Sequence, residues 1–288
     1  MSLIQFPHET PMKVTIPIAG EISLKIADRI NQQVDYATSG LPKGFLLVSR
    51  GLELAEEAVG FGFPVLKRGL QTLFPGRIEL AVEQHDSLRS VQVVFTLNLA
   101  EKIHRAGIGS IKSGWVYAIK NSLAALIRAI SPLRGLLTAA SSGLRRLFRW
   151  ETTFEDAGIQ ATIKMIHTIH GNTGNIKVEV DLTDLPAGIT EVVVMNEQGA
   201  HAFDHYLDSS GISLQGDEIG CWDEVTAEDA CFSSASQQVA FRLRQVEGAR
   251  LYRGRELEGS RLAWAGFGYS FPPSIKKFVY ELGIESQA

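Results

Sequence analysis

Two runs of the chain, Ile78-Glu-Leu-Ala-Val82 and Val91-Gln-Val-Val-Phe-Thr-Leu-Asn-Leu99, alternate apolar and polar residues on either side of the polar loop His85-Asp-Ser87. A period of two is typical of a strand with one buried face, so the runs predict a β-hairpin. Its apolar face packs on neighbouring helices or, as in a pore-forming protein, faces lipid, because lipid-facing strands alternate in the same way. The sequence leaves both interpretations open.

The rest of residues 1–105 predicts a mixed unit of helices and strands. Val14-Thr-Ile-Pro-Ile18 is typical of a short strand, which Pro17 places at a sheet edge. Apolar residues recur every four positions from Ile22 to Val34, which predicts an amphipathic helix. Two further helices are predicted over residues 52–59 and 65–73.

The net charge of −4 is distributed unevenly along the chain. Residues 101–150 hold nine basic residues and one acidic residue, whereas residues 151–288 hold 10 basic and 21 acidic residues. Apolar residues recur at intervals of three or four over residues 106–150, which predicts a basic amphipathic helical segment broken near Pro132. The residues expected to contact an anionic partner are Lys112, Trp115, Lys120, Arg128, Arg134, Arg145, Arg146, Arg149 and Trp150.

Three interpretations of the basic segment stay open. Its apolar face can pack in the core while its arginines pair with the acidic C-terminal half. Its cations and aromatic residues also suit an anionic membrane, where they meet lipid phosphates. The same cations neutralise nucleic-acid phosphates, although no recognised nucleic-acid-binding motif accompanies them.

Short alternating runs separated by turn-forming residues continue from Glu151, and they predict an antiparallel β-sandwich over residues 151–270. Pro272-Pro-Ser274 resembles a helix start, and Gly283 is placed as the residue after a helix, so residues 271–288 predict a terminal helix and tail. The expected fold class is therefore α+β, with a mixed N-terminal unit (1–105), a basic helical segment (106–150), a β-sandwich and a terminal helix.

One enzymatic interpretation rests on Cys231. Glu228-Asp-Ala-Cys-Phe-Ser-Ser234 resembles the signature of bacterial caspase-like peptidases, and Ile169-His-Gly171 resembles their histidine motif. In such an enzyme His170 would activate the thiolate of Cys231 for nucleophilic attack. The charged run before Cys231 argues against this interpretation, because the nucleophile of that family follows a buried parallel strand.

A metal site is a further candidate, because His167, His170, His201 and His205 precede Cys221 and Cys231. The spacing matches no standard ligand pattern, and a strand would place His167 and His170 on opposite faces. We therefore expect no metal ion. The sequence also lacks a P-loop, a complete dinucleotide fingerprint and a serine-nucleophile elbow, so no cofactor is expected and no small-molecule substrate is indicated.

Composition is that of a globular chain: 288 residues, 45% hydrophobic and 21% charged, which excludes disordered, collagenous and coiled-coil classes. The longest uncharged stretch, Leu262–Ile275, is too short to span a bilayer. Two cysteines exclude a disulfide scaffold, and the first residues lack the pattern of a signal peptide. The expected location is the cytoplasm, with peripheral contact to the inner membrane as an option.

The layout is similar to an uncharacterised, mainly cyanobacterial family of two-part proteins. The residues that carry the resemblance are the strand Val14–Ile18, the helix-like run Ile22–Gln33, and the stretches Leu185–Gly199 and Gly211–Gly216. The resemblance implies a bacterial cytoplasmic protein and supplies no catalytic residues. We expect a non-enzymatic interaction or regulatory protein of a bacterial multi-protein system, with a protein partner. The alternatives are a membrane-acting effector and the cysteine peptidase.

Overall fold

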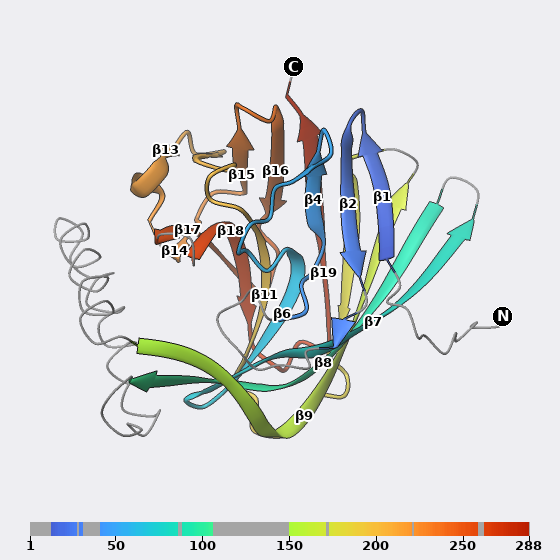
Figure 1. The fold of residues 1–288 in the computed structure, drawn as a ribbon, viewed down its shortest axis with the longest axis vertical. Coiled ribbons are helices and arrows are strands. Elements are labelled where there is room, and N and C mark those ends of the chain that lie inside the picture. Colours follow the sequence, from blue (N-terminus) through green and yellow to red (C-terminus); the bar gives the residue numbers. More distant parts are fainter. Residues whose placement is uncertain are drawn as a thin grey trace.

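The computed structural model describes residues 13–27, 29–30, 41–85, 88–105, 150–170, 173–220, 222–258 and 262–287. The described part of the chain is nearly all β, with 68% strand and 2% helix. Its strands form a sheet of four and a sheet of 15, which pack on each other as a β-sandwich (Figure 1). The single short helix among the described residues is the 3-10 helix η3 (Gly216–Ile219).

The smaller sheet follows the order β1 (Lys13–Ala19), β2 (Ile22–Ala27), β4 (Leu46–Ser49), β5 (Leu52–Glu53). The larger sheet begins with β13 (Ser213–Gln215), β12 (His205–Asp208), β15 (Asp229–Ser234), β16 (Val239–Arg244), β19 (Lys277–Ser286) and β10 (Asn175–Asp181). It continues with β9 (Trp150–His170), β8 (Leu88–Arg105), β7 (Gln71–His85), β6 (Phe61–Arg68), β11 (Glu191–Gln198), β18 (Leu262–Phe271), β17 (Arg250–Glu258) and β14 (Asp223–Glu224). The two-residue strand β3 (Arg29–Ile30) pairs with β7 outside this order.

The predicted hairpin is present as β7 and β8, which pair antiparallel from Leu73↔Ala100 to His85↔Leu88. β8 pairs with β9 along its other edge, so it is an interior strand of the sheet. Its apolar residues Val91, Val93 and Phe95 are completely buried in the core between the sheets. The apolar face of β8 is therefore packed within the sandwich, whereas Val82 of β7 is 37% exposed.

The helix predicted between Ile22 and Val34 is wrong over the described residues. Residues 22–27 form β2, whose side chains alternate between buried and half-buried positions. Residues four apart share one face of a helix, but they also share one face of a strand, because four is a multiple of the strand period of two. The deciding residue is Leu24, which is buried on the same face as Ile22 and Ile26.

The predicted terminal helix is also wrong, for the same reason. Residues 277–286 form β19, in which Phe278, Tyr280, Leu282 and Ile284 are all buried. Gly283 lies inside this strand and pairs with Asn175 of β10 rather than ending a helix. The pattern that suggested a helix included Val279, which is only half-buried in the structure.

The two other N-terminal helices are replaced by strands and turns. Residues 52–59 contain the two-residue strand β5 and a turn, and residues 65–73 are divided between β6 and β7. Gly69 makes the turn between these two strands with φ 58°, in the left-handed region that favours glycine. The fold class α+β is thus incorrect for the described residues. Of the predicted helical segment 106–150, residues 106–149 lie outside them and Trp150 begins the strand β9.

The strand-rich, antiparallel character predicted for residues 151–270 agrees with the observed β-sandwich. The larger sheet also takes in N-terminal residues, because β6 pairs with β11 from Glu191↔Lys67 to Asn196↔Phe61. The N-terminal strands β8, β7 and β6 therefore lie side by side between C-terminal strands of one hydrogen-bonded sheet. In the part of the chain that the structure describes, no helix has the length and apolar character needed to cross a membrane.

Candidate functional site

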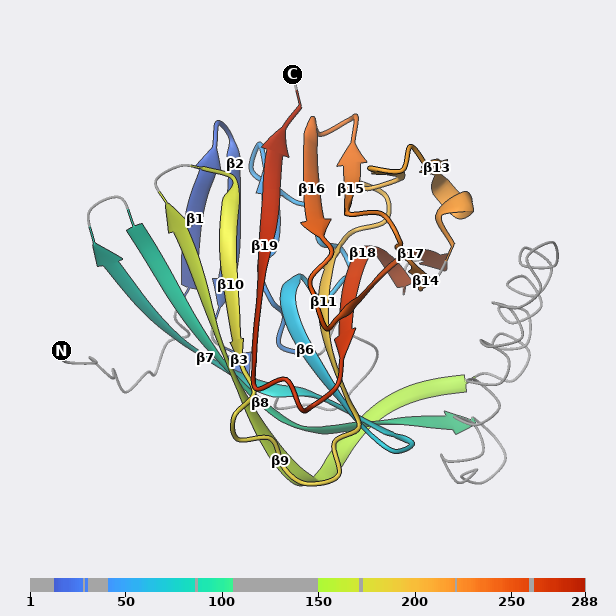
Figure 2. The ribbon, with the colours of Figure 1, turned by 180° about the vertical axis from the view of Figure 1, so that it is seen from behind.

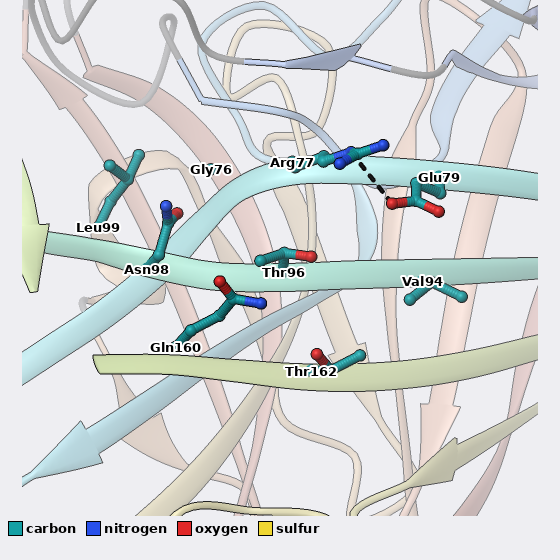
Figure 3. Close-up of a pocket in the computed structure, with 9 residues that line it drawn as sticks. All are labelled: Gly76, Arg77, Glu79, Val94, Thr96, Asn98, Leu99, Gln160 and Thr162. Carbon is teal, nitrogen blue, oxygen red and sulfur yellow. Dashed lines mark ion pairs between the residues drawn. The ribbon is translucent and has the colours of Figure 1, made fainter. Parts of the chain in front are cut away.

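A hollow on the solvent side of β7, β8 and β9 is the main candidate site (Figure 3). The hollow forms where the pairing register of the strands shifts. The register of β7 with β8 shifts at Pro75, and the register of β8 with β9 shifts between Leu97 and Leu99 of β8. Between the pairs Leu99↔Asp156 and Leu97↔Ala161, the backbone of β9 covers five residue steps and that of β8 only two. Bulges of this kind bend a strand and redirect its side chains, which opens the surface at this point.

A glycine allows β9 to make this bulge. Gly158 has φ 66°, and its N–H donates a hydrogen bond of 2.8 Å to Asp156 Oδ1. A left-handed conformation costs a residue with a side chain roughly 1–2 kcal/mol, so glycine suits the position. Gly76 has a comparable role in β7, because a Cβ atom there would overlap Asn98 Oδ1 on the neighbouring strand.

The hollow has a volume of about 460 Å³. The register places Arg77, Thr96 and Thr162 in one line across the three strands. Figure 3 shows these side chains on one face of the three ribbons. The six polar residues that line the hollow are Arg77 and Glu79 from β7, Thr96 and Asn98 from β8, and Gln160 and Thr162 from β9.

The charges in this lining cancel. Arg77 Nε lies 3.0 Å from Glu79 Oε1, and both side chains are about half exposed. Thr96, Thr162, Asn98 and Gln160 are uncharged, and each can both donate and accept hydrogen bonds. Among the described residues, Asn98 Oδ1 is a buried acceptor without a hydrogen-bond partner. Val94 and Leu99 add apolar surface to the same hollow.

A second concentration of polar groups lies at the end of β11, where Asn196, Glu197 and Gln198 are all buried. The amide of Gln198 links the two sheets: Oε1 accepts from Leu47 N–H at 3.0 Å, and Nε2 donates to the Phe45 carbonyl at 3.1 Å. Asn196 Oδ1 accepts from Gly62 N–H at 3.0 Å. These bonds satisfy backbone groups inside the core and have a structural role.

Glu197 is the unusual member of this group, because its carboxyl is only 3% exposed. Burial raises the pKa of Glu197 to about 8, the Val59 N–H at 3.5 Å from Oε2 opposes that rise, and the negative charge of Glu256 adds to it. A neutral carboxylic acid can serve as a general acid. Glu197 is not among the residues that line the hollow.

The comparisons with known proteins identify no family. Neither a scan of protein-family models nor a search of curated proteins finds a match. Among solved structures, the chain is similar to a quadruple mutant of the α-N-acetylgalactosaminidase NagBb from Bifidobacterium bifidum, with TM-score 0.47 and 11% identity. The alignment covers 96% of this chain and 36% of that enzyme.

Two further structures resemble the chain more weakly. The GH36 α-galactosidase AgaA A355E from Geobacillus stearothermophilus aligns with TM-score 0.44 and 8% identity, over 96% of this chain and 41% of that enzyme. A galactose mutarotase-like protein from Lactobacillus casei aligns with TM-score 0.38 and 9% identity, over 95% and 99% of the two chains. The chain thus spans well under half the length of the first solved structures it matches.

The structure does not bring Cys231 and His170 together. Cys231 lies in β15 and His170 ends β9, and the strands β16, β19 and β10 separate them in the sheet (Figure 2). Four strand spacings correspond to about 19 Å, far beyond hydrogen-bonding distance. Burial also raises the pKa of the Cys231 thiol to about 11, the opposite of what an activated nucleophile needs.

The histidines considered for a metal site are dispersed. His167 is buried in the core and His170 is exposed, so the predicted opposite orientation of the two is confirmed. His201 Nδ1 pairs with Glu56 Oε2 and His205 Nδ1 pairs with Asp204 Oδ1, both at 2.7 Å. Among the described residues, no group of three or more His, Cys, Asp or Glu side chains could hold a metal ion.

The residues expected to contact an anionic partner lie mostly outside the described part of the chain: Lys112, Trp115, Lys120, Arg128, Arg134, Arg145, Arg146 and Arg149. Trp150 is described as the first residue of β9, where it pairs with Arg105 of β8. The hollow was not predicted from the sequence. A glycine or proline within an alternating run, as at Gly76 and Gly158, is the local signal of such a bulge.

Proposed function

We propose that the protein is a non-enzymatic interaction protein of a bacterial multi-protein system, in which the β-sandwich presents residues 106–149 to an anionic partner. The observation that carries the proposal is the pairing of β8 with β9 as far as Arg105↔Trp150 (Figure 1). Both ends of the segment therefore leave the sandwich side by side. The bacterial setting rests on the family resemblance noted in the sequence.

The composition of the segment supports an anionic partner. Residues 106–149 hold seven lysines or arginines and no aspartate or glutamate. Concentrated positive charge attracts a negative surface over roughly 10 Å at moderate ionic strength, and it accelerates association. Tryptophan and arginine are also enriched at the centres of protein interfaces.

Some carboxylates of the acidic C-terminal half have cations of their own within the sandwich. In the described residues, six of these carboxylates already pair with lysine or arginine: Glu179, Glu191, Asp217, Asp223, Asp229 and Glu285. The charge of the segment is therefore not needed to balance those six.

Charge reversal tests the proposal. The triple variant Arg145→Glu, Arg146→Glu, Arg149→Glu is compared with Lys13→Glu, Arg244→Glu, Lys276→Glu, which makes the same charge change at exposed sandwich positions. Partners are cross-linked in the source cells, identified, purified and titrated against each protein. We expect the segment variant to lose at least about tenfold in affinity, which corresponds to 1.4 kcal/mol. Equal affinities of both variants for the partner would refute the proposal.

An anionic membrane is the second candidate partner, favoured by Trp115 among the cations of the segment and by Trp150 directly after it. The hairpin residues Ile78, Val93 and Phe95 have no part in this version, because they are buried in the core. Co-sedimentation with phosphatidylglycerol and phosphatidylcholine vesicles tests it. Binding to the anionic vesicles that the segment variant loses and the control keeps would support a membrane, whereas equal sedimentation with both lipids would exclude it.

A further inference from the structure

We infer that the hollow on β7, β8 and β9 is a binding site for a small, uncharged, polyhydroxylated ligand of the size and chemistry of a monosaccharide. None of its lining residues belongs to the basic segment, and the inference does not depend on the proposed function. Its volume of about 460 Å³ lies within the range of roughly 300–1,000 Å³ found for small-molecule sites.

Charge selects the class of ligand. The guanidinium of Arg77 is already paired with Glu79 at 3.0 Å, and the other polar lining residues are two threonines and two amides. A charged ligand would lose hydration on entering the hollow, and no unpaired opposite charge in the lining would offset that desolvation cost. An uncharged ligand avoids this penalty.

Hydrogen-bonding capacity narrows the class further. Hydroxyls and carboxamides are both donors and acceptors, and Thr96, Thr162 and Gln160 bring these groups to one surface from two neighbouring strands. Each hydroxyl of a sugar is likewise a donor and an acceptor, so a ring bearing several hydroxyls can pair with such a lining. Val94 and Leu99 supply apolar surface for the C–H groups of the ring.

The shape of the hollow is built by the backbone rather than by movable side chains. The bulges on the three strands coincide at one level of the sheet. Sites on strands held in this way are more precise than sites on loops, and the ligand loses less affinity to reordering of the protein.

The test uses saturation-transfer NMR with the full-length protein and the methyl glycosides of glucose and galactose as probes. Glucuronate and glucosamine serve as their negatively and positively charged counterparts. We expect saturable binding of at least one neutral glycoside with a Kd of about 1 mM, and weaker binding of the charged sugars. No saturable signal from either neutral glycoside up to about 50 mM would overturn the inference.

Variants locate the binding. Thr162→Val keeps the shape of the side chain and removes its hydroxyl, and Gln160→Leu removes the amide, so each should weaken binding about fivefold to tenfold. The matched control is Thr168→Val, on the same strand and the same face but outside the hollow. Unchanged affinity in both hollow variants would overturn the inference. The Arg145, Arg146 and Arg149 charge-reversal variant should bind the sugar normally, so failure of the proposed function leaves this result unaffected.

Discussion

Tyr280 donates a hydrogen bond to Asn196 Oδ1 across 3.0 Å in the buried core, and so joins β19 to β11. The same oxygen accepts the Gly62 N–H at 3.0 Å, which ties β6 to the pair. Burial raises the pKa of Tyr280, because the phenolate would be desolvated there. One amide oxygen of β11 therefore accepts hydrogen bonds from β6 and β19, so it connects three strands that are distant in the sequence.

Removing the Tyr280 hydroxyl or the Asn196 side chain should destabilise the sandwich, and the second loss should be larger than the first. Tyr280→Phe leaves Asn196 Oδ1 bonded to Gly62, so we expect a loss of about 1 kcal/mol in the free energy of unfolding. Asn196→Ala leaves the Gly62 N–H and the Tyr280 hydroxyl without their acceptor and creates a cavity, for a loss of about 3 kcal/mol. Urea unfolding measures both values. Equal losses in the two variants would show that the bond to Gly62 contributes nothing.

Gly62 should be less replaceable than Gly69, another glycine with positive φ. A Cβ atom at Gly62, where φ is 70°, would lie 2.7 Å from His167 Nε2. Gly69, where φ is 58°, has no atom within 4 Å of a Cβ position and is the matched control. Gly69→Ala should cost about 1 kcal/mol from backbone strain alone, and Gly62→Ala about 2 kcal/mol more because it overpacks the core. Thermal unfolding of the pair tests this difference, and matching Tm values would contradict it.

Glu197 should make the protein less stable at alkaline pH. Its pKa is raised to about 8 in the folded state, above the ordinary value of 4.5, so the folded protein holds an extra proton between these values. Its contribution to stability is complete below pH 4.5 and is lost as pH rises through 8. Glu197→Gln should therefore gain on the wild type as pH rises, by on the order of 3 kcal/mol at pH 9.

The measurement for Glu197 is the urea midpoint between pH 4 and pH 9. The control is Glu281→Gln in β19, where the side chain is exposed. Its stability should parallel the wild type across the range. If the Glu197→Gln profile also runs parallel to the wild type, the buried carboxyl is not neutral in the folded protein.

The thiol of Cys231 should be a poor nucleophile. With a pKa raised from 9.0 to about 11, its thiolate population near pH 7 is about 100-fold below that of an ordinary cysteine. Alkylation by iodoacetamide should slow by a similar factor relative to the urea-unfolded protein, measured in a Cys221→Ser background. A folded-state rate equal to the unfolded rate would contradict this expectation and reopen the peptidase interpretation.

The alternation of residues 78–99 was sufficient to predict a hairpin, because a period of two directly reflects which side of a strand is buried. The same local information failed for residues 22–27 and 277–282. Apolar residues four apart, such as Ile22 and Ile26 or Phe278 and Leu282, share one face of a helix and also one face of a strand. At the candidate site the sequence supplied residue types but not their neighbours. Thr96 and Thr162 are adjacent only because β8 pairs with β9 in the observed register.

The local sequence pattern was thus sufficient to predict strands in both halves of the chain and to predict which face of β8 is buried. Tertiary structure alone decided that β6 pairs with β11, that Cys231 and His170 lie on strands four positions apart, and that three bulges meet to form a hollow. The physical reason is that the choice of which face of a strand is buried depends on the alternation of apolar and polar residues within that one segment. The choice of partner strand depends on hydrogen bonds and packing between segments more than 100 residues apart, as for Phe61 and Asn196.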